Sequence, residues 1–174
     1  MPIEQYREMA LVLLVSIAAV NDLTTRLIPN RLLLAGLGGA LLLHALSAEP
    51  GAALLSALGG MGVGLAMFLP FYLVRGMAAG DVKMMAVVGA FCGPNDAMQI
   101  AVLTWCVGGA MALVLVLLRG RLQLALGNIG RLVLGAISPR ARAATATAPH
   151  SSGSLPYGVA IAVGTVMVLV RHYG

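Results

Sequence analysis

The chain has 174 residues, of which 60% are hydrophobic and 10% are charged, and its mean hydropathy is +0.96. Soluble domains carry about 25% charged residues, so the composition excludes an ordinary soluble protein and indicates an integral membrane protein. The apolar residues form continuous runs and do not alternate with polar ones, which excludes a transmembrane β-barrel and predicts a bundle of helices.

The formal net charge of +5 is the second constraint on function. An excess of Lys and Arg in a membrane protein usually marks its cytoplasmic loops, and the few aromatic residues offer no stacking surface for bases. We therefore expect the lipid bilayer, and no nucleic acid, as a partner. Cys92 and Cys106 form no Cys-x-x-Cys motif and the three histidines are scattered, so we expect neither a metal nor a cofactor.

Six apolar segments are predicted to cross the membrane. The first is followed by a polar turn over residues 21–30, which contains Asp22, Pro29 and Asn30. Pro29 or Asn30 is expected to begin the second segment, as a first-turn proline or as an N-cap. The six segments span about residues 6–20, 32–46, 52–74, 82–92, 97–118 and 155–170.

Two of these segments have features that bear on packing and function. Gly59, Gly60, Gly62 and Gly64 in the third segment predict a smooth face, where neighbouring helices can approach closely. At about 1.5 Å per residue, the fourth segment is too short to cross about 30 Å of hydrocarbon. One of its ends is therefore expected to lie below the membrane surface. If it is the first end, Asp81 lies in a cavity and not in bulk water.

The connection between the fifth and sixth segments is predicted to contain one more helix. Residues 121–137 place apolar side chains on one helical stripe, which predicts an amphipathic helix on the cytoplasmic membrane surface. A further span is the alternative, but Asn128 and Arg131 near its centre disfavour it. Residues 140–154 are expected to form a loop. The predicted fold is thus an all-α integral membrane protein with about six transmembrane helices plus this surface helix, in a single domain over residues 1–174.

The distribution of basic residues predicts the orientation of the bundle. With six spans, nine of the eleven Lys and Arg residues fall on one face, which should therefore be cytoplasmic, and both termini lie outside the cytoplasm. The acidic residues have the opposite distribution. Four of the six are predicted to lie outside the cytoplasm, and only Asp22 and Asp81 lie on the cytoplasmic face. These nine basic residues are Arg26, Arg31, Arg75, Lys83, Arg119, Arg121, Arg131, Arg140 and Arg142.

Asp22 and Asp81 are the candidate catalytic residues. The first segment runs inward and ends near Asp22, whereas the fourth runs outward and begins near Asp81, so both carboxylates are expected at one membrane depth. Two close carboxylates cannot both ionise easily, so one holds a proton while the other stays charged. The charged one can take a proton from water that attacks a peptide carbonyl, and the protonated one can donate to the carbonyl oxygen. Gly80 would let a substrate backbone come close.

Other interpretations of these residues stay open at this point. Asp81 can instead be the N-cap of the fourth segment, and Asp22 a polar residue that ends the first. A non-enzymatic membrane component or an ion-coupled carrier would also use membrane carboxylates, although no midplane acid and no inverted repeat are visible. Lys83 can pair with lipid phosphate, influence Asp81, or extend toward the membrane surface.

Three motifs lie in order at the ends of the predicted segments: Asp22 with Ile28-Pro29-Asn30, then Gly80-Asp81-Val82-Lys83, and Leu155-Pro156-Tyr157-Gly158 before the last segment. Together they closely resemble the type IV prepilin peptidases, which are membrane aspartyl proteases with a Gly-x-Gly-Asp signature. The resemblance covers nearly the whole chain and implies that Asp22 and Asp81 are catalytic. It further implies cleavage of the basic leader of prepilins or pseudopilins at the cytoplasmic face of the inner membrane.

Two departures from the family pattern refine this expectation. Ala78 replaces the first glycine of the signature, and no N-terminal domain with paired cysteines precedes the first segment. We therefore expect peptidase activity without methyltransferase activity, as in the similar stand-alone peptidases of tight-adherence (Flp) pilus systems. Archaeal preflagellin peptidases are the neighbouring alternative. Pro29 and residues 156–158 are hypothesised to shape the substrate cleft.

Overall fold

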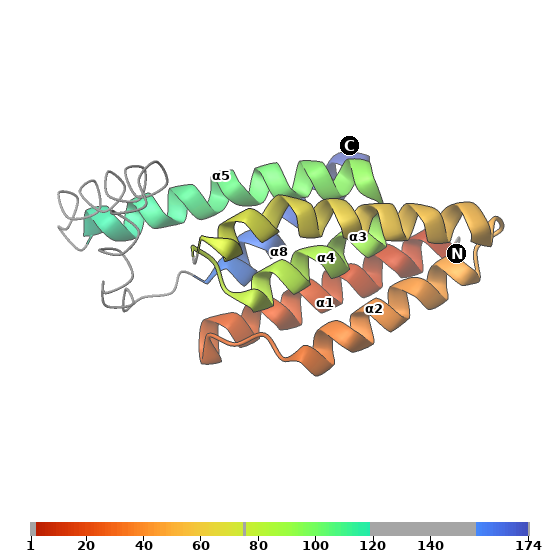
Figure 1. The fold of residues 1–174 in the computed structure, drawn as a ribbon, viewed down its shortest axis with the longest axis horizontal. Coiled ribbons are helices and arrows are strands. Elements are labelled where there is room, and N and C mark those ends of the chain that lie inside the picture. The colour runs from red at the N-terminus through yellow and green to blue at the C-terminus, as the bar shows by residue number, and fades with distance from the viewer. Residues whose placement is uncertain (1–2, 75, 119–155, 174) are drawn as a thin grey trace. The chain divides into compact units, whose positions relative to one another are not determined.

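The computed structural model describes residues 3–74, 76–118 and 156–173. In this part of the chain the backbone forms six helices and no strand (Figure 1). Residues 1–108 and 156–174 make up one compact unit, and residues 109–155 make up a second. The helix bundle that is described in this section is the first unit. The helices are α1 (Ile3–Thr25), α2 (Asn30–Ala45), α3 (Pro50–Leu73), α4 (Ala79–Cys92), α5 (Pro94–Leu118) and α8 (Tyr157–Tyr173).

Three of these helices, α1, α3 and α5, are long and apolar enough to cross a membrane, while α2 and α8 are shorter apolar helices. The all-helical class predicted from the sequence is confirmed for the described residues, and the count of six spans stays a prediction. The amphipathic helix predicted for residues 121–137 and the loop predicted for residues 140–154 lie outside the described residues.

The polar turn predicted for residues 21–30 is shorter than expected, because α1 continues through Asn21 and Asp22 to Thr25. The polar side chains at this end bond back to the helix: Thr25 Oγ1 donates to the Asn21 carbonyl at 2.9 Å, and Asn21 Nδ2 donates to Ile17 at 2.9 Å. Arg26 then takes a left-handed conformation, with φ of 57°, and its N–H donates to the Asp22 carbonyl at 3.1 Å.

Two N-caps differ from the alternatives left open by the sequence. Pro29 occupies the N-cap position of α2 and Asn30 is the first helical residue, so the Asn30 side chain does not cap the helix. Ala78 is the N-cap of α4, which places Asp81 inside the first turn. The interpretation of Asp81 as an N-cap is therefore wrong, and its burial needs another reason.

Helix α4 is the centre of the bundle. It packs against α1, α2, α3 and α8, and every residue from Val82 to Phe91 except Lys83 is buried. With 14 residues it extends over only about 21 Å. It ends at Gly93, whose φ of 83° and ψ of 175° form a positive-φ conformation that glycine adopts without steric cost. Asp81 is thus placed by the most enclosed helix of the described residues.

The contact between α3 and α4 is the most extensive in the bundle, and glycines make it close. A Cβ added at Gly60 would overlap the Gly89 carbonyl oxygen, and one added at Gly64 would overlap the Met85 carbonyl oxygen. Gly62 has open space around it. The predicted small-residue face is therefore confirmed for Gly60 and Gly64, which are four residues apart and lie on the same face of α3. Gly62, between them, lies on another face.

His44 joins three helices at the end of α4. Its buried ring Nε2 lies 2.8 Å from the Ala90 carbonyl oxygen, and its Nδ1 lies 3.2 Å from Arg7 Nη1. The carbonyl requires a donor and the guanidinium requires an acceptor, so Nε2 carries the proton of a neutral ring. Within α4 the Ala90 carbonyl would bond to the N–H of residue 94, but Pro94 has none, and His44 supplies the missing donor.

Replacing His44 by Phe is expected to lower the free energy of unfolding by about 1–3 kcal/mol, because the buried Ala90 carbonyl loses its donor while the ring volume is kept. Thermal unfolding of the protein in detergent checks this. Leu42→Phe is the matched control, since Leu42 is exposed on the same helix and should tolerate the change. Equal stability of His44→Phe and the wild type would contradict the role given to His44.

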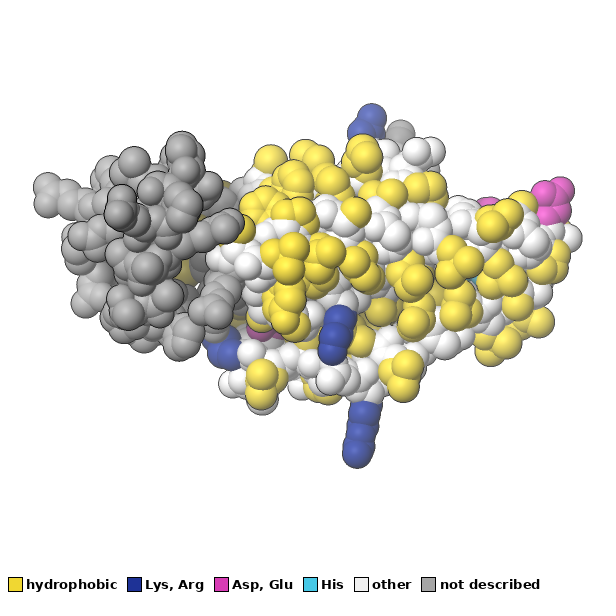
Figure 2. Space-filling model, in the orientation of Figure 1, with side chains coloured by type: hydrophobic (Ala, Val, Ile, Leu, Met, Phe, Trp, Pro, Cys, Tyr) yellow, Lys and Arg dark blue, Asp and Glu magenta, His cyan; other side chains and the backbone are white. Residues whose placement is uncertain are grey.

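The outer faces of the helices carry many large apolar side chains. Figure 2 shows hydrophobic side chains spread over the helices in view, with few charged groups between them. Leu34, Leu55 and Leu65 are all exposed. Such continuous apolar exposure is expected of helices that face lipid.

Candidate functional site

Asp22 lies near the end of α1 and its side chain is only 6% exposed. The carboxylate Oδ2 accepts a 2.8 Å hydrogen bond from the main-chain N–H of Gly158, at the start of α8. The positive charge of Arg26, one turn further along the chain, also acts on this carboxylate. A buried carboxylate in this position is therefore held by a donor from a distant helix and a neighbouring cation.

Asp81 lies in the first turn of α4 and is 5% exposed. Its burial follows from the central position of α4, since the neighbouring Val82, Met84 and Met85 are buried as well. The negative charge of Asp22 acts directly on Asp81. The structure thus brings together the two acidic residues that the sequence predicted to meet, from helices α1 and α4, in an environment largely closed to water.

The start of α8 lies beside both carboxylates. Gly158 bonds to Asp22, and the charge of Asp81 acts on the phenol of Tyr157. The Tyr157 ring packs against Gly108 of α5, where an added Cβ would lie 2.7 Å from Tyr157 Cε1. Pro156 is buried. Of the motif at residues 155–158, Tyr157 and Gly158 thus lie at the site, and Pro156 directly precedes them.

The remaining predicted residues lie at the starts of α2 and α4. Lys83 Nζ donates to Asn30 Oδ1 at 3.1 Å, and both side chains are exposed, so this bond joins the second turn of α4 to the first residue of α2. A Cβ added at Gly80 would make only ordinary contact with Ile28, 3.5 Å away. Pro29 is exposed at its N-cap position. Whether Pro29, Gly80 and Lys83 contact a substrate stays a prediction.

Ala78 stands where the resemblance implies a glycine. Its φ of −78° and ψ of 150° are extended backbone that any residue adopts. The side chain is exposed. Alanine at this position therefore causes no backbone strain.

Sequence reasoning missed two neighbours of the site. Arg26, whose charge acts on Asp22, follows it by four residues, and this i, i+4 spacing of opposite charges was a usable signal once α1 was extended. Ile28 lies against Gly80, and it had no predicted role beyond its place in the Ile28-Pro29-Asn30 motif. Neither changes which residues are candidates for catalysis.

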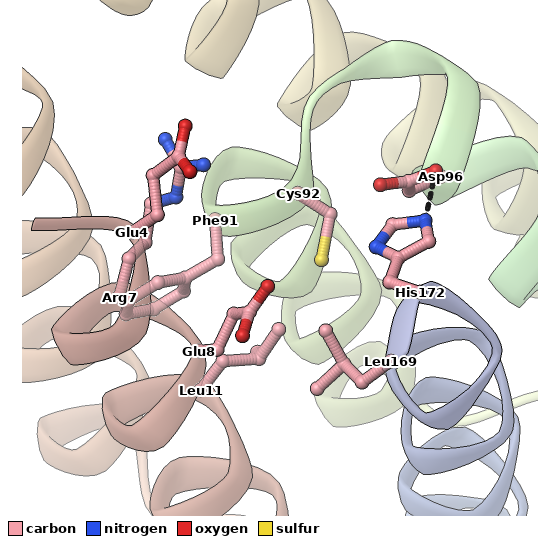
Figure 3. A pocket seen from close by; sticks show the side chains of 9 residues that line it. All are labelled: Glu4, Arg7, Glu8, Leu11, Phe91, Cys92, Asp96, Leu169 and His172. Carbon is pink, nitrogen blue, oxygen red and sulfur yellow. Dashed lines mark ion pairs between the residues drawn. The ribbon is translucent and has the colours of Figure 1, made fainter. Parts of the chain in front are cut away.

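A second polar cluster lies at the opposite ends of α1, α4 and α8. Here a pocket of about 200 Å³ is lined by both acidic and basic side chains (Figure 3). His172 Nε2 lies 3.7 Å from Asp96 Oδ1. Among the described residues no group of three or more His, Cys, Asp or Glu side chains could hold a metal ion. The lining residues are Glu4, Arg7, Glu8, Leu11, Phe91, Cys92, Asp96, Leu169 and His172.

The fold and the site define a class: a helical protein with spans that suit a membrane and two buried, interacting carboxylates at one end of its central helix. Residues 9–119 match the model of the type IV leader peptidase family, and the chain belongs to this family. The matched range includes Asp22 and Asp81 but ends before the start of α8. No curated protein and no solved structure matched the chain.

Proposed function

We propose that this protein is an aspartyl endopeptidase that removes the leader peptide of prepilin-like substrates, with Asp22 and Asp81 as its catalytic pair. One observation carries the proposal: the two carboxylates are both buried, and the charge of Asp22 acts on Asp81. Burial of two interacting acids is costly unless they share a proton, and a shared proton is what acid–base catalysis by such a pair requires. Membership of a leader peptidase family supports the same reaction class.

The reaction follows from the chemistry of the pair. The ionised carboxylate takes a proton from water, whose oxygen forms a bond to the peptide carbonyl carbon, while the protonated carboxyl donates its proton to the carbonyl oxygen. The tetrahedral intermediate then collapses. The C–N bond breaks as the carboxyl that took the proton from water gives it to the leaving nitrogen. The other carboxylate takes a proton from a hydroxyl of the intermediate, and the new carboxyl group and amine depart. Each turnover uses one water and returns both aspartates to their starting protonation.

The proposed substrates are prepilins or pseudopilins for pilus or related secretion assembly, cut at the cytoplasmic face of the inner membrane. The excess of basic residues on the predicted cytoplasmic face supports this orientation, with both termini outside the cytoplasm. A peptide bond inside a helix is shielded by its own hydrogen bonds, so the substrate must unwind locally at the bond to be cut. The proposal covers peptide cleavage alone, and the absence of methyltransferase activity stays a prediction.

Co-expression with a prepilin tests the proposal. The wild type is expected to convert the prepilin to a shorter form on a gel, with a new N-terminus found by mass spectrometry just before the hydrophobic helix. Gly62→Ala is a suitable control for expression, because Gly62 has open space around it and lies away from the carboxylates. A preflagellin expressed in a parallel strain distinguishes the two substrate classes.

Two results would count against this function. Cleavage of the preflagellin in place of the prepilin would keep the protease and change its substrate. Failure to cleave either, by a protein that is present in the membrane, would overturn the proposal. Ion-dependent uptake into vesicles would then be the measurement that supports a carrier.

A further inference from the structure

We propose that the main-chain N–H of Gly158 positions Asp22 for catalysis, so that the start of α8 aligns this carboxylate. This inference rests on the proposed peptidase function and deepens it. Gly158 would position one atom, Oδ2 of Asp22, although the two residues are 136 positions apart in the sequence.

The first reason is that each partner satisfies a need of the other. Gly158 is the second residue of α8, so its N–H has no acceptor within the helix. Asp22 is buried and needs a donor for its carboxylate. The 2.8 Å bond meets both needs, and it places the negative charge at the end of a helix where the peptide dipoles favour an anion.

The second reason is that this position has no room for a side chain. A Cβ added at Gly158 would lie 2.9 Å from Asp22 Oδ2, 3.0 Å from its Cβ and 3.2 Å from its Cγ. Three atoms of one side chain surround the site of the missing Cβ. A larger residue at 158 therefore has to displace Asp22 or move the start of α8, and either change breaks the alignment.

The bond also fixes the orientation of the Asp22 carboxylate. With Oδ2 held by the Gly158 N–H, the position of Oδ1 is set as well. A donor at the end of a helix favours the ionised form of a carboxylate without transferring a proton itself. Asp81 has a main-chain donor of the same kind, the N–H of Ala78 at the start of α4.

Steady-state kinetics of Gly158→Ala test the positioning role, with Gly62→Ala as the matched control. We expect kcat and kcat/KM for a prepilin in detergent to fall by the same factor, on the order of 10²-fold, while KM is unchanged. A residue that only shaped the cleft would instead raise KM. A normal kcat in Gly158→Ala, with or without a raised KM, would overturn the inference.

A second measurement does not depend on activity. In protein labelled with ¹⁵N-glycine and ¹³C-carbonyl tyrosine, only the Gly158 and Gly174 amides follow a labelled tyrosine, and Gly174→Ala distinguishes the two resonances. Asp22→Ala is expected to move the Gly158 resonance upfield because the hydrogen bond is lost, whereas Asp96→Ala, at the opposite end of the bundle, should leave it in place. An unmoved resonance in Asp22→Ala would overturn the inference even where Gly158→Ala is poorly folded.

The two measurements separate this inference from the proposed function. If the amide resonance depends on Asp22 but the wild type cleaves no prepilin, the hydrogen bond stands while the positioning role falls together with the peptidase function. If cleavage depends on Asp22 but Gly158→Ala keeps a normal kcat, the peptidase function stands and only the positioning role is overturned.

Discussion

Asp22→Asn and Asp81→Asn should each abolish cleavage of a co-expressed prepilin. Asparagine keeps the size of the side chain but cannot accept or donate the proton that the reaction moves, and loss of such a group costs about 10²–10⁴-fold in rate. In Asp22→Asn the new amide oxygen can still accept the Gly158 N–H, so the fold around α8 should survive. The ratio of cut to uncut prepilin on a gel measures the effect, after the amount of each variant in the membrane is matched.

Asp96→Asn is the control for this experiment, because it makes the same chemical change in the pocket at the other end of the bundle. It should keep cleavage near the wild-type level. Near-normal cleavage by either Asp22→Asn or Asp81→Asn would show that this aspartate has no catalytic role, and the paired-carboxylate mechanism would then be wrong.

Gly60→Ala should destabilise the bundle strongly. The new Cβ would overlap the Gly89 carbonyl oxygen and come within 2.7 Å of the Gly93 carbonyl carbon, and both belong to main chain that cannot rotate away. Helices α3 and α4 therefore have to separate, which typically costs about 1–3 kcal/mol for one added methyl group and more for a larger side chain. Thermal unfolding in detergent, together with the amount of protein found in the membrane, measures the loss.

The reciprocal change gives a sharper comparison. Gly89→Ala meets the Gly60 carbonyl from the opposite side and should cost a similar amount, whereas Gly62→Ala, in open space on α3, should be neutral or slightly stabilising. Gly59→Ala meets Pro94 only at ordinary contact distance, 3.8 Å, and should also be tolerated. Equal stability of all four variants would mean that α3 and α4 are less closely packed than described.

The predicted helices were recognisable from the apolar runs because most runs are bounded by Gly, Pro or polar residues, which favour the ends of helices. Gly93 followed by Pro94 ends α4 at the expected residue. The end of α1 was placed too early, since Asn21 and Asp22 look like turn residues until their bonds to the preceding turn and to α8 are known. At this point the tertiary contacts of α1 outweighed the local preference of Asn21 and Asp22 for a turn.

The candidate pair could be predicted because helix direction alone brings the end of one segment and the start of another to one depth. Its supporting contacts could not. The bond from Gly158 uses a main-chain N–H, which every residue except proline has, and the donor to Ala90 is a histidine 46 residues away. Neither leaves a local pattern in the sequence, so only the packed helices reveal them.

The shortness of α4 has a consequence for how the protein responds to its lipid environment. Helices α1 and α3, with 23 and 24 residues, are long enough to match a bilayer, while the 14-residue α4 is enclosed by α1, α2, α3 and α8. Thickness mismatch acts on helices that touch acyl chains, so a thicker or thinner bilayer would tilt the outer helices. The position of Asp81 is set instead by glycine contacts between α3 and α4, whereas Asp22 lies on α1 and moves when that helix tilts. A change in bilayer thickness therefore shifts the two carboxylates relative to each other.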